Sequence, residues 1–175
     1  MRKLLNSELN RKSIDEFKTS TKIPVVVVLD NIRSQHNIGA IFRTSDAFLI
    51  EAIYLCGITA TPPNNEIHKS ALGAENSVDW VYFKDTKDAF NTLKSKSYTI
   101  ISIEQAENSA KLHELILKKD IKYAIVFGNE VKGIEQSLVS ESDICLEIEQ
   151  FGTKHSLNVS ISAGIVIWEF FKQLA

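Results

Sequence analysis

Two loops in the C-terminal third of the chain carry residues whose types and spacing suit ligand binding. The first, Gly128–Gly133 with sequence GNEVKG, is rich in backbone N–H donors and follows the apolar run Ala124–Phe127. The second, Gln150–Asn158, follows another apolar run, Ile144–Ile148. Apolar runs of this length between turn residues are typical of buried strands. We therefore interpret the two loops as parts of one ligand site at the ends of two strands.

Several other kinds of site are disfavoured by what surrounds these loops. Gly133 is followed by Ile134-Glu135 instead of Lys-Ser/Thr, and no Gly-x-Gly-x-x-Gly occurs, so neither a Walker nor a Rossmann site is expected. The four histidines have no ligand spacing with the cysteines, so we predict no metal site. A nucleophile made by Ser156 with His155 is weak, because adjacent side chains rarely face one another and no acid is placed to orient the imidazole.

Each polar residue of these loops also has a simpler interpretation. Asn37, Asn129, Asn158 and Ser156 are all residue types that cap helices or form turns. Taken one at a time, capping or turn formation is the favoured interpretation for each of them.

The elements that must position the loops alternate between strand and helix. Strand-like runs are predicted at Val25–Leu29, Ala52–Cys56, Trp80–Phe83, Tyr98–Ile103, Ala124–Phe127 and Ile144–Ile148. Helical segments are predicted after a capping box at Ser13–Glu16, at Asn37–Phe48, Ile67–Leu72 and Asp85–Ser95, and from Ser156 onward. Such alternation predicts an α/β fold in which helices sandwich a mostly parallel sheet.

Two of these helices bear on function. In the first, Asn37 is predicted as the N-cap, which places Arg43 on the second turn. The C-terminal helix is apolar nearly all round and contains small residues, including Ala163 and Gly164. A helix of this kind should be buried, and we expect a second subunit to cover it.

Length and composition indicate one ordinary globular domain of 175 residues, of which 44% are hydrophobic and 24% charged. The segment 1–22 carries a net charge of +3 within a chain of −2, so we divide the chain into a basic helical extension, 1–22, and a domain, 23–175. A solvated face is the favoured explanation of that charge, with phosphate contact as the alternative.

Cys56 and Cys145 show no pairing pattern and are expected to be reduced. The chain shows no signal peptide and no membrane-length apolar run, so a cytoplasmic location is expected.

Three ordered motifs together are more specific than any single loop. They read Asn37-x-Gly39-x-x-x-Arg43, Gly128-Asn129-Glu130-x-x-Gly133 and Ser156-Leu157-Asn158-Val159-Ser160. In this order they resemble the motifs of the SpoU/TrmH family of RNA ribose 2′-O-methyltransferases, within the SPOUT class. The resemblance runs from about Val25 to the C-terminus.

The resemblance implies a C-terminal trefoil knot, an exception to the rule that chains do not thread their own loops. It implies that S-adenosylmethionine is held largely by main-chain atoms at three places, which match Gly128, Ile148 and Leu157, and that Asn129 and Gly133 contribute from the loop that begins at Gly128. It also implies a homodimer in which the arginine of the first motif completes the site of the partner subunit, with the C-terminal helix as a good candidate for the interface.

The matching catalytic residue is Arg43, with Asn37, Glu130, Ser156 and Asn158 holding it and the ribose in position. A guanidinium stays protonated at neutral pH and is a poor base, so Arg43 is expected to orient the 2′-hydroxyl and a neighbouring phosphate. RNA is the implied partner, and tRNA is favoured over rRNA because the extra RNA-binding domain of the rRNA enzymes is missing.

Two alternatives remain at this stage. One is a catalytically inactive RNA-binding or assembly protein with the same fold, and the other is an unrelated nucleotide-binding α/β domain. The chain also departs from the family at Ile148-Glu149-Gln150, where members usually carry Ile-Pro-Met. That change places two polar side chains beside the cofactor loop.

Overall fold

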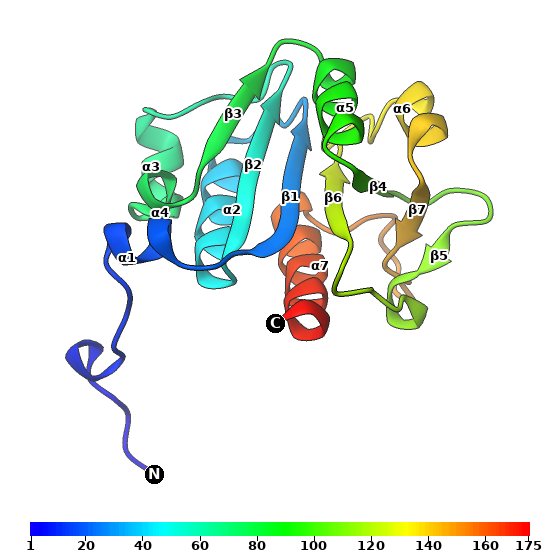
Figure 1. Ribbon diagram of the computed structural model, residues 1–175. Coiled ribbons are helices and arrows are strands. Elements are labelled where there is room, and N and C mark those ends of the chain that lie inside the picture. The colour runs from blue at the N-terminus through cyan, green and yellow to red at the C-terminus, as the bar shows by residue number, and fades with distance from the viewer.

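The computed structural model describes residues 1–175, apart from the side chain of Asn6. Seven strands form one sheet in the order β3-β2-β1-β6-β4-β7-β5, and all the paired strands are parallel (Figure 1). The strands are β1 (Ile23–Asp30), β2 (Ile50–Cys56), β3 (Trp80–Phe83), β4 (Tyr98–Ile103), β5 (Ala110–Lys111), β6 (Lys122–Phe127) and β7 (Ile144–Glu147). The predicted mostly parallel α/β sheet is therefore confirmed.

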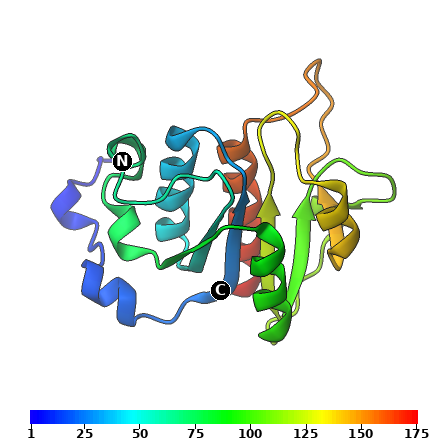
Figure 2. The same cartoon turned by 90° about the horizontal axis from the view of Figure 1, so that it is seen from above.

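Helices lie on both faces of this sheet, as the view from above shows (Figure 2). The α-helices are α1 (Ile14–Thr19), α2 (Gln35–Ala47), α3 (Asn65–Ala71), α4 (Ala74–Ser77), α5 (Thr86–Ser95), α6 (Gln136–Glu141) and α7 (Val159–Leu174), and two short 3₁₀ turns are η1 (Asn6–Glu8) and η2 (Leu112–Glu114). Buried residues of α2 and α7 pack on one face, and those of α5 and α6 pack on the other. The helices α3 and α4 pack against α2.

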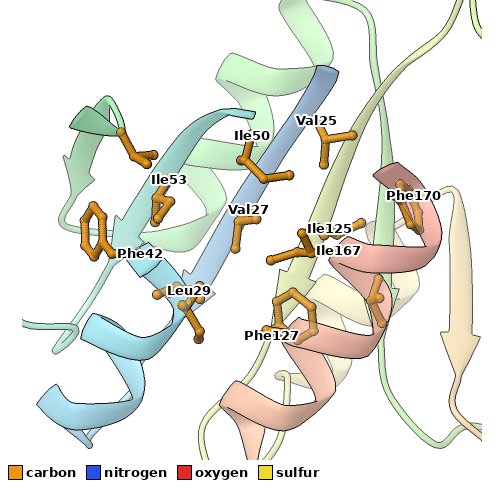
Figure 3. Packing of buried hydrophobic residues seen from close by; sticks show 14 of the residues in the cluster. Val25, Val27, Leu29, Phe42, Ile50, Ile53, Ile125, Phe127, Ile167 and Phe170 are labelled. Atoms are coloured by element: carbon orange, nitrogen blue, oxygen red, sulfur yellow. The ribbon is translucent and has the colours of Figure 1, made fainter. Parts of the chain in front are cut away.

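The central strands β1 and β6 are buried on both faces because the consecutive residues Val25–Leu29 and Ala124–Phe127 are all apolar. Side chains alternate between the two faces of a strand. Val27 and Ile125 therefore join the cluster under α2 and α7 (Figure 3), whereas Val28 and Val126 join the cluster under α5 and α6. Phe170 of α7 is also fully buried in the first cluster. This packing fixes α7, and hence the loop that precedes it, against the sheet.

The start of α2 differs from its prediction. The helix begins at Gln35 with Ser34 as its N-cap, and Ser34 Oγ accepts a hydrogen bond of 3.2 Å from Asn37 N. Asn37 was thus wrongly predicted as the cap, because two capping residues lie three positions apart and the sequence does not rank them. The earlier start moves Arg43 to the third turn of α2.

The C-terminal helix begins later than predicted. Asn158 is the N-cap of α7, and its Oδ1 accepts from Ser160 N at 2.9 Å. Ser156 and Leu157 therefore belong to the preceding loop. The predicted strand at Ile144–Ile148 ends one residue early, at Glu147.

The N-terminal extension contains the predicted capping box. Ser13 Oγ accepts from Glu16 N at 3.2 Å, and Glu16 Oε2 accepts from Ser13 N at 2.7 Å. Phe17 of this helix is buried in the core, so α1 is attached to the body of the protein. The division of the chain at residue 22 and the trefoil knot stay predictions. Within the part of the chain that the structure describes, no helix is long and apolar enough to cross a membrane.

Candidate active site

A cleft of about 830 Å³ opens at the carboxyl ends of β4, β6 and β7. Its walls are formed by the residues that follow these strands and by the loop that leads into α7. Ligands of open parallel sheets bind outside the carboxyl ends of the strands, and small-molecule sites commonly have volumes of this size. The cleft is therefore the candidate active site.

The structure brings most of the predicted site residues to this cleft. The residues predicted to bind a cofactor, Gly128, Asn129, Gly133, Ile148 and Leu157, all line it. So do three residues predicted to be catalytic, Glu130, Ser156 and Asn158. Asn37 stands just behind them: its Nδ2 donates to Glu130 Oε1 at 3.2 Å, and its Oδ1 accepts from Asn158 Nδ2 at 3.2 Å. One side chain of the first motif thus connects the second motif to the third.

Arg43 is the exception. It is exposed on α2, and the described lining of the cleft does not include it. Arg43 lies six residues beyond Asn37, which is about 9 Å along a helix. Arg43 therefore lies outside the cleft of its own chain.

The loop between Gly128 and Gly133 is a tight turn that only glycine permits at both ends. A Cβ on Gly128 would lie 2.4 Å from the carbonyl carbon of Gly133, and Gly133 itself has φ +68°. Asn129 closes the turn, since its Oδ1 accepts from the backbone N–H groups of Val131 at 2.9 Å and Lys132 at 3.1 Å. The Asn129 side chain is thus occupied by loop structure.

Glu130 fastens this loop to the start of α2. Its carboxylate accepts from Arg33 N at 2.9 Å, Ser34 N at 3.0 Å and Asn37 Nδ2 at 3.2 Å. Partial burial raises the pKa of Glu130, but the donated hydrogen bonds outweigh burial and hold that pKa below its usual value. The carboxylate is therefore ionised at neutral pH, and it lies beside the positive end of the helix dipole.

Asn158 caps a helix, and its side chain also contacts the first motif. Its Oδ1 caps α7, while its Nδ2 donates to Asn37. Ser156 and Leu157 are exposed in the loop before the helix.

The departure at residues 148–150 leaves the cleft in place. Ile148 and Gln150 line it, whereas the carboxylate of Glu149 lies 3.2 Å from Nδ1 of His113. The polar replacement at residue 149 is thus paired with a neighbouring side chain.

Sequence reasoning identified Glu130 but missed the other three acidic residues of the cleft. The lining that the structure describes contains four glutamates against a single lysine, Lys132; the glutamates are Glu104, Glu107, Glu130 and Glu147. Glu147 is paired with Lys111, which lowers the pKa of Glu147. A usable signal was present for Glu104, because it follows the correctly predicted strand β4. This lining suits a ligand that carries positive charge.

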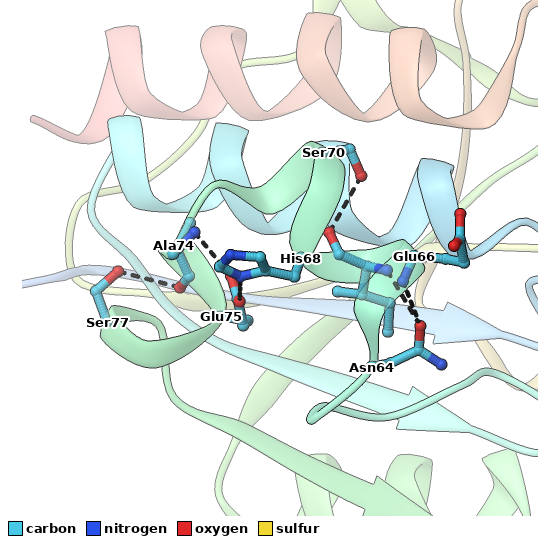
Figure 4. A network of polar contacts seen from close by, with 9 residues as sticks. Asn64, Glu66, His68, Ser70, Ala74, Glu75 and Ser77 are labelled. Carbon is cyan, nitrogen blue, oxygen red and sulfur yellow. Dashed lines mark hydrogen bonds and ion pairs between the residues drawn. The ribbon is translucent and has the colours of Figure 1, made fainter.

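A second, smaller cavity of about 400 Å³ lies beside α3, α4 and the start of β3. Its polar side chains form a local network (Figure 4). His68 Nδ1 lies 2.5 Å from Glu75 Oε1, and Asn64 Oδ1 caps α3 by accepting from Glu66 N at 2.9 Å. The contact between His68 and Glu75 connects the two short helices. Cys56 and Cys145 are free thiols, and no cluster of metal-binding side chains occurs among the described residues.

Known structures share this architecture. The AdoMet-bound rRNA methyltransferase of Sinorhizobium meliloti superposes with a TM-score of 0.80 at 25% identity, covering 94% of this chain and 62% of that one. A TrmH/SpoU tRNA modifying enzyme of A. aeolicus gives a TM-score of 0.80 at 23% identity, covering 91% and 80%. The fold is therefore that of the SpoU/TrmH methyltransferases.

Sequence comparison extends this result from the fold to the family. Residues 24–168 match the model of the SpoU rRNA Methylase family, and the chain belongs to that family. It is 29% identical over 171 residues to the tRNA (guanosine(18)-2′-O)-methyltransferase of Thermus thermophilus, covering 95% of this chain and 84% of the relative. It is 30% identical over 159 residues to the 23S rRNA (guanosine-2′-O-)-methyltransferase RlmB of Neisseria meningitidis, covering 91% of this chain but only 62% of that relative.

Proposed function

We propose that this protein is an S-adenosylmethionine-dependent RNA methyltransferase that methylates a ribose 2′-hydroxyl, with tRNA favoured over rRNA as its substrate. One observation carries the proposal: Asn37 of the first motif hydrogen-bonds to Glu130 of the second and Asn158 of the third, at the edge of the cleft. The three motifs thus form one site. The similar S. meliloti enzyme binds AdoMet.

The residues of the cleft fit this cofactor. Phe127, Ile148 and Leu157 offer apolar surface for an adenine ring, and the turn at Gly128 offers backbone groups. The acidic lining complements a ligand with a sulfonium and an ammonium group. When bound, the cofactor supplies a methyl group that is already activated by the positive sulfur. The protein must then place the 2′-hydroxyl in line with that methyl group and assist loss of its proton.

The chain's own residues divide this work. Ionised Glu130 holds the loop after β6 against α2, and Asn37 and Asn158 link α2 to the start of α7. Arg43 is the candidate for orienting the hydroxyl and the adjacent phosphate, since its planar guanidinium can donate to both. Because Arg43 lies outside its own chain's cleft, we assign it to the cleft of a partner subunit.

The surface of α7 supports a homodimer. Ile161, Ile165 and Trp168 are 55%, 39% and 50% exposed and occur at helical spacing, so they form one apolar stripe on the solvent side. Trp168 packs against Phe48, which follows α2, with ring centroids 5.3 Å apart. A symmetric interface over this stripe would involve α2 together with α7. Light scattering should give about twice the chain mass of 19.7 kDa, and a monomer at micromolar concentration would contradict the shared site.

The preference for tRNA is supported by the Thermus relative, a tRNA 2′-O-methyltransferase to which this chain is similar over 95% of its own length and 84% of the length of that enzyme.

The test is methyl transfer itself. The protein is incubated with labelled S-adenosylmethionine and unmodified bulk tRNA or rRNA, and the RNA is digested to nucleosides for mass spectrometry. We expect a 2′-O-methylnucleoside from tRNA. A methyl group on a base would contradict the proposed reaction, and RNA binding without any transfer would favour the inactive RNA-binding protein.

A further inference from the structure

We propose that Glu104 and Gln105, directly after β4, form a clamp. The clamp fixes the position of the two cofactor loops relative to each other and thereby sets the affinity of the cleft for S-adenosylmethionine. The two loops are 128–134 after β6 and 148–158 after β7. The inference rests on the proposed cofactor, but it assigns a role to residues outside the three motifs.

The order of the strands creates the need for such a clamp. In the sheet, β4 lies between β6 and β7. Neighbouring strands are about 4.8 Å apart, so the ends of β6 and β7 are separated by about 10 Å. The segment that leaves β4 therefore lies between the two loops. Glu104 and Gln105 are its first two residues, and both line the cleft.

Glu104 holds the first loop. Its Oε2 accepts a hydrogen bond of 3.1 Å from Ile134 N, and its Oε1 accepts one of 3.0 Å from Gln105 N. A Cβ on Gly133 would lie 2.3 Å from Glu104 Oε2, so the carboxylate sits against the bare face of that glycine. The backbone of Glu104 is fixed in turn, because its N–H donates to Leu146 O of β7 at 3.1 Å.

Gln105 holds the second loop. Its Nε2 donates to the carbonyl oxygen of His155 at 2.9 Å, fifty residues further along the chain. His155 stands two residues before Leu157, which lines the cleft. The bond between Glu104 and the N–H of Gln105 joins the two halves of the clamp.

The function of the clamp is preorganisation. Residues 151–158 are all exposed, so little packing fixes this loop. A ligand that must order a loop has a lower affinity than one that meets the loop already in place. Loss of the clamp should therefore weaken cofactor binding while leaving the reacting groups unchanged.

The sharpest variant is Gln105→Glu, which keeps the size of the side chain but replaces its donor with an acceptor. A carboxylate cannot donate to the His155 carbonyl, so calorimetry should show S-adenosylmethionine binding about tenfold weaker, and Gln105→Ala should behave similarly. If charge alone mattered at this position, Gln105→Glu would bind the cationic cofactor more tightly. That result would overturn the clamp.

Gln173→Ala is the matched control. Gln173 Nε2 donates to the carbonyl of Leu115 at 3.0 Å, which is the same kind of bond away from the cleft. We expect Gln173→Ala to retain wild-type cofactor affinity even if its melting temperature falls. Equal loss of cofactor affinity in both variants would show a general effect of stability and would contradict the clamp.

Glu104→Gln tests the other half. A glutamine must aim its NH₂ group at Ile134 N or at Gln105 N, so one of the two bonds is lost. Hydrogen exchange of the loop after β6 should become faster, and the KM for the cofactor should rise about tenfold. A lower rate of methyl transfer with unchanged KM and unchanged hydrogen exchange would refute the clamp.

The outcomes separate this inference from the proposed function. Failure of the wild-type protein to bind S-adenosylmethionine would overturn the proposed function. Wild-type binding together with unchanged affinity in Gln105→Glu and Glu104→Gln would overturn the clamp alone.

Discussion

The neighbouring strands β1 and β6 are each followed or ended by a carboxylate, and the pKa values of these two carboxylates are shifted in opposite directions. Asp30, at the end of β1, is 3% exposed, and both Thr86 Oγ1 and Asn31 Nδ2 donate to the same oxygen, Oδ1. Burial raises the pKa of Asp30. Glu130, three residues beyond the end of β6, is exposed and spreads its hydrogen bonds over both oxygens, so the net shift of its pKa is downward.

The loops after β1 and β2 also differ from the loops after β4, β6 and β7. Beyond β1 and β2 the chain satisfies its own backbone, since Thr59 Oγ1 donates to Leu29 O at 3.0 Å and accepts from Ile32 N at 2.9 Å. Beyond β6, β4 and β7 the loops are held at a distance by side chains, which leaves a cleft between them. The first group of loops supports the fold, and the second group is available to a ligand.

Leu157→Arg should have the largest effect, because it places a bulky charge in the cleft. We expect S-adenosylmethionine binding to fall below detection by calorimetry. The matched control is Ile58→Arg, because Ile58 is 65% exposed in the loop after β2, outside the cleft. Equal binding by both variants would mean that the cleft has been misplaced.

Arg43→Ala should lower single-turnover methyl transfer to tRNA by a factor of about 100 or more, with cofactor affinity nearly unchanged, because its contribution belongs to the transition state. Arg43→Lys should not restore the rate, since a point charge cannot replace the planar guanidinium. Wild-type turnover in Arg43→Ala would contradict the mechanism, and loss of cofactor binding would show a structural role.

Glu130→Gln should lower stability by about 1 kcal/mol at pH 7, a value discounted for the exposure of the residue. The folded-state pKa of Glu130 is lowered, so its stabilisation is present above the usual glutamate pKa and is lost as the pH falls through the lowered pKa. Denaturant melts at pH 7 and at acidic pH should therefore show the variant approaching wild type in acid. A pH-independent difference would contradict this origin.

Asp30→Asn should have the smallest effect and the opposite sign. The folded-state pKa of Asp30 is raised, so the ionised group destabilises the fold increasingly as the pH rises above the usual aspartate pKa. Asparagine keeps the Oδ1 acceptor for Thr86 and Asn31, so we expect a gain below about 1 kcal/mol at pH 7 that shrinks in acid. A destabilised Asp30→Asn at pH 7 would show that the charge itself is needed.

The sequence predicted the sheet well because its strands are dense apolar runs. The bounds of β3 and β4 are as predicted, whereas the two-residue β5 and the six-residue α6 are too short to produce a periodic pattern. The N-cap of α2 was misplaced because Ser34 and Asn37 are both capping residues, and tertiary contacts decide between them.

The candidate site was predicted in part for a similar reason. Its motif residues could be recognised because three motifs occur together in order, and all of them except Arg43 gather at or beside one cleft. Glu104 and Gln105 belong to none of the motifs. The place of Glu104 after a predicted strand could have marked it as a site residue, but the role proposed for the two residues depends on β4 lying between β6 and β7. That order is not the order of the sequence.

Hydrogen exchange with and without S-adenosylmethionine tests the central contrast most directly. We predict that the cofactor slows exchange in residues 103–107, 128–134 and 147–158, and leaves residues 57–64 and 84–86 beyond β2 and β3 unchanged. Protection confined to the loops beyond β1, β2 and β3, with none after β4, β6 and β7, would contradict the assignment of the cleft.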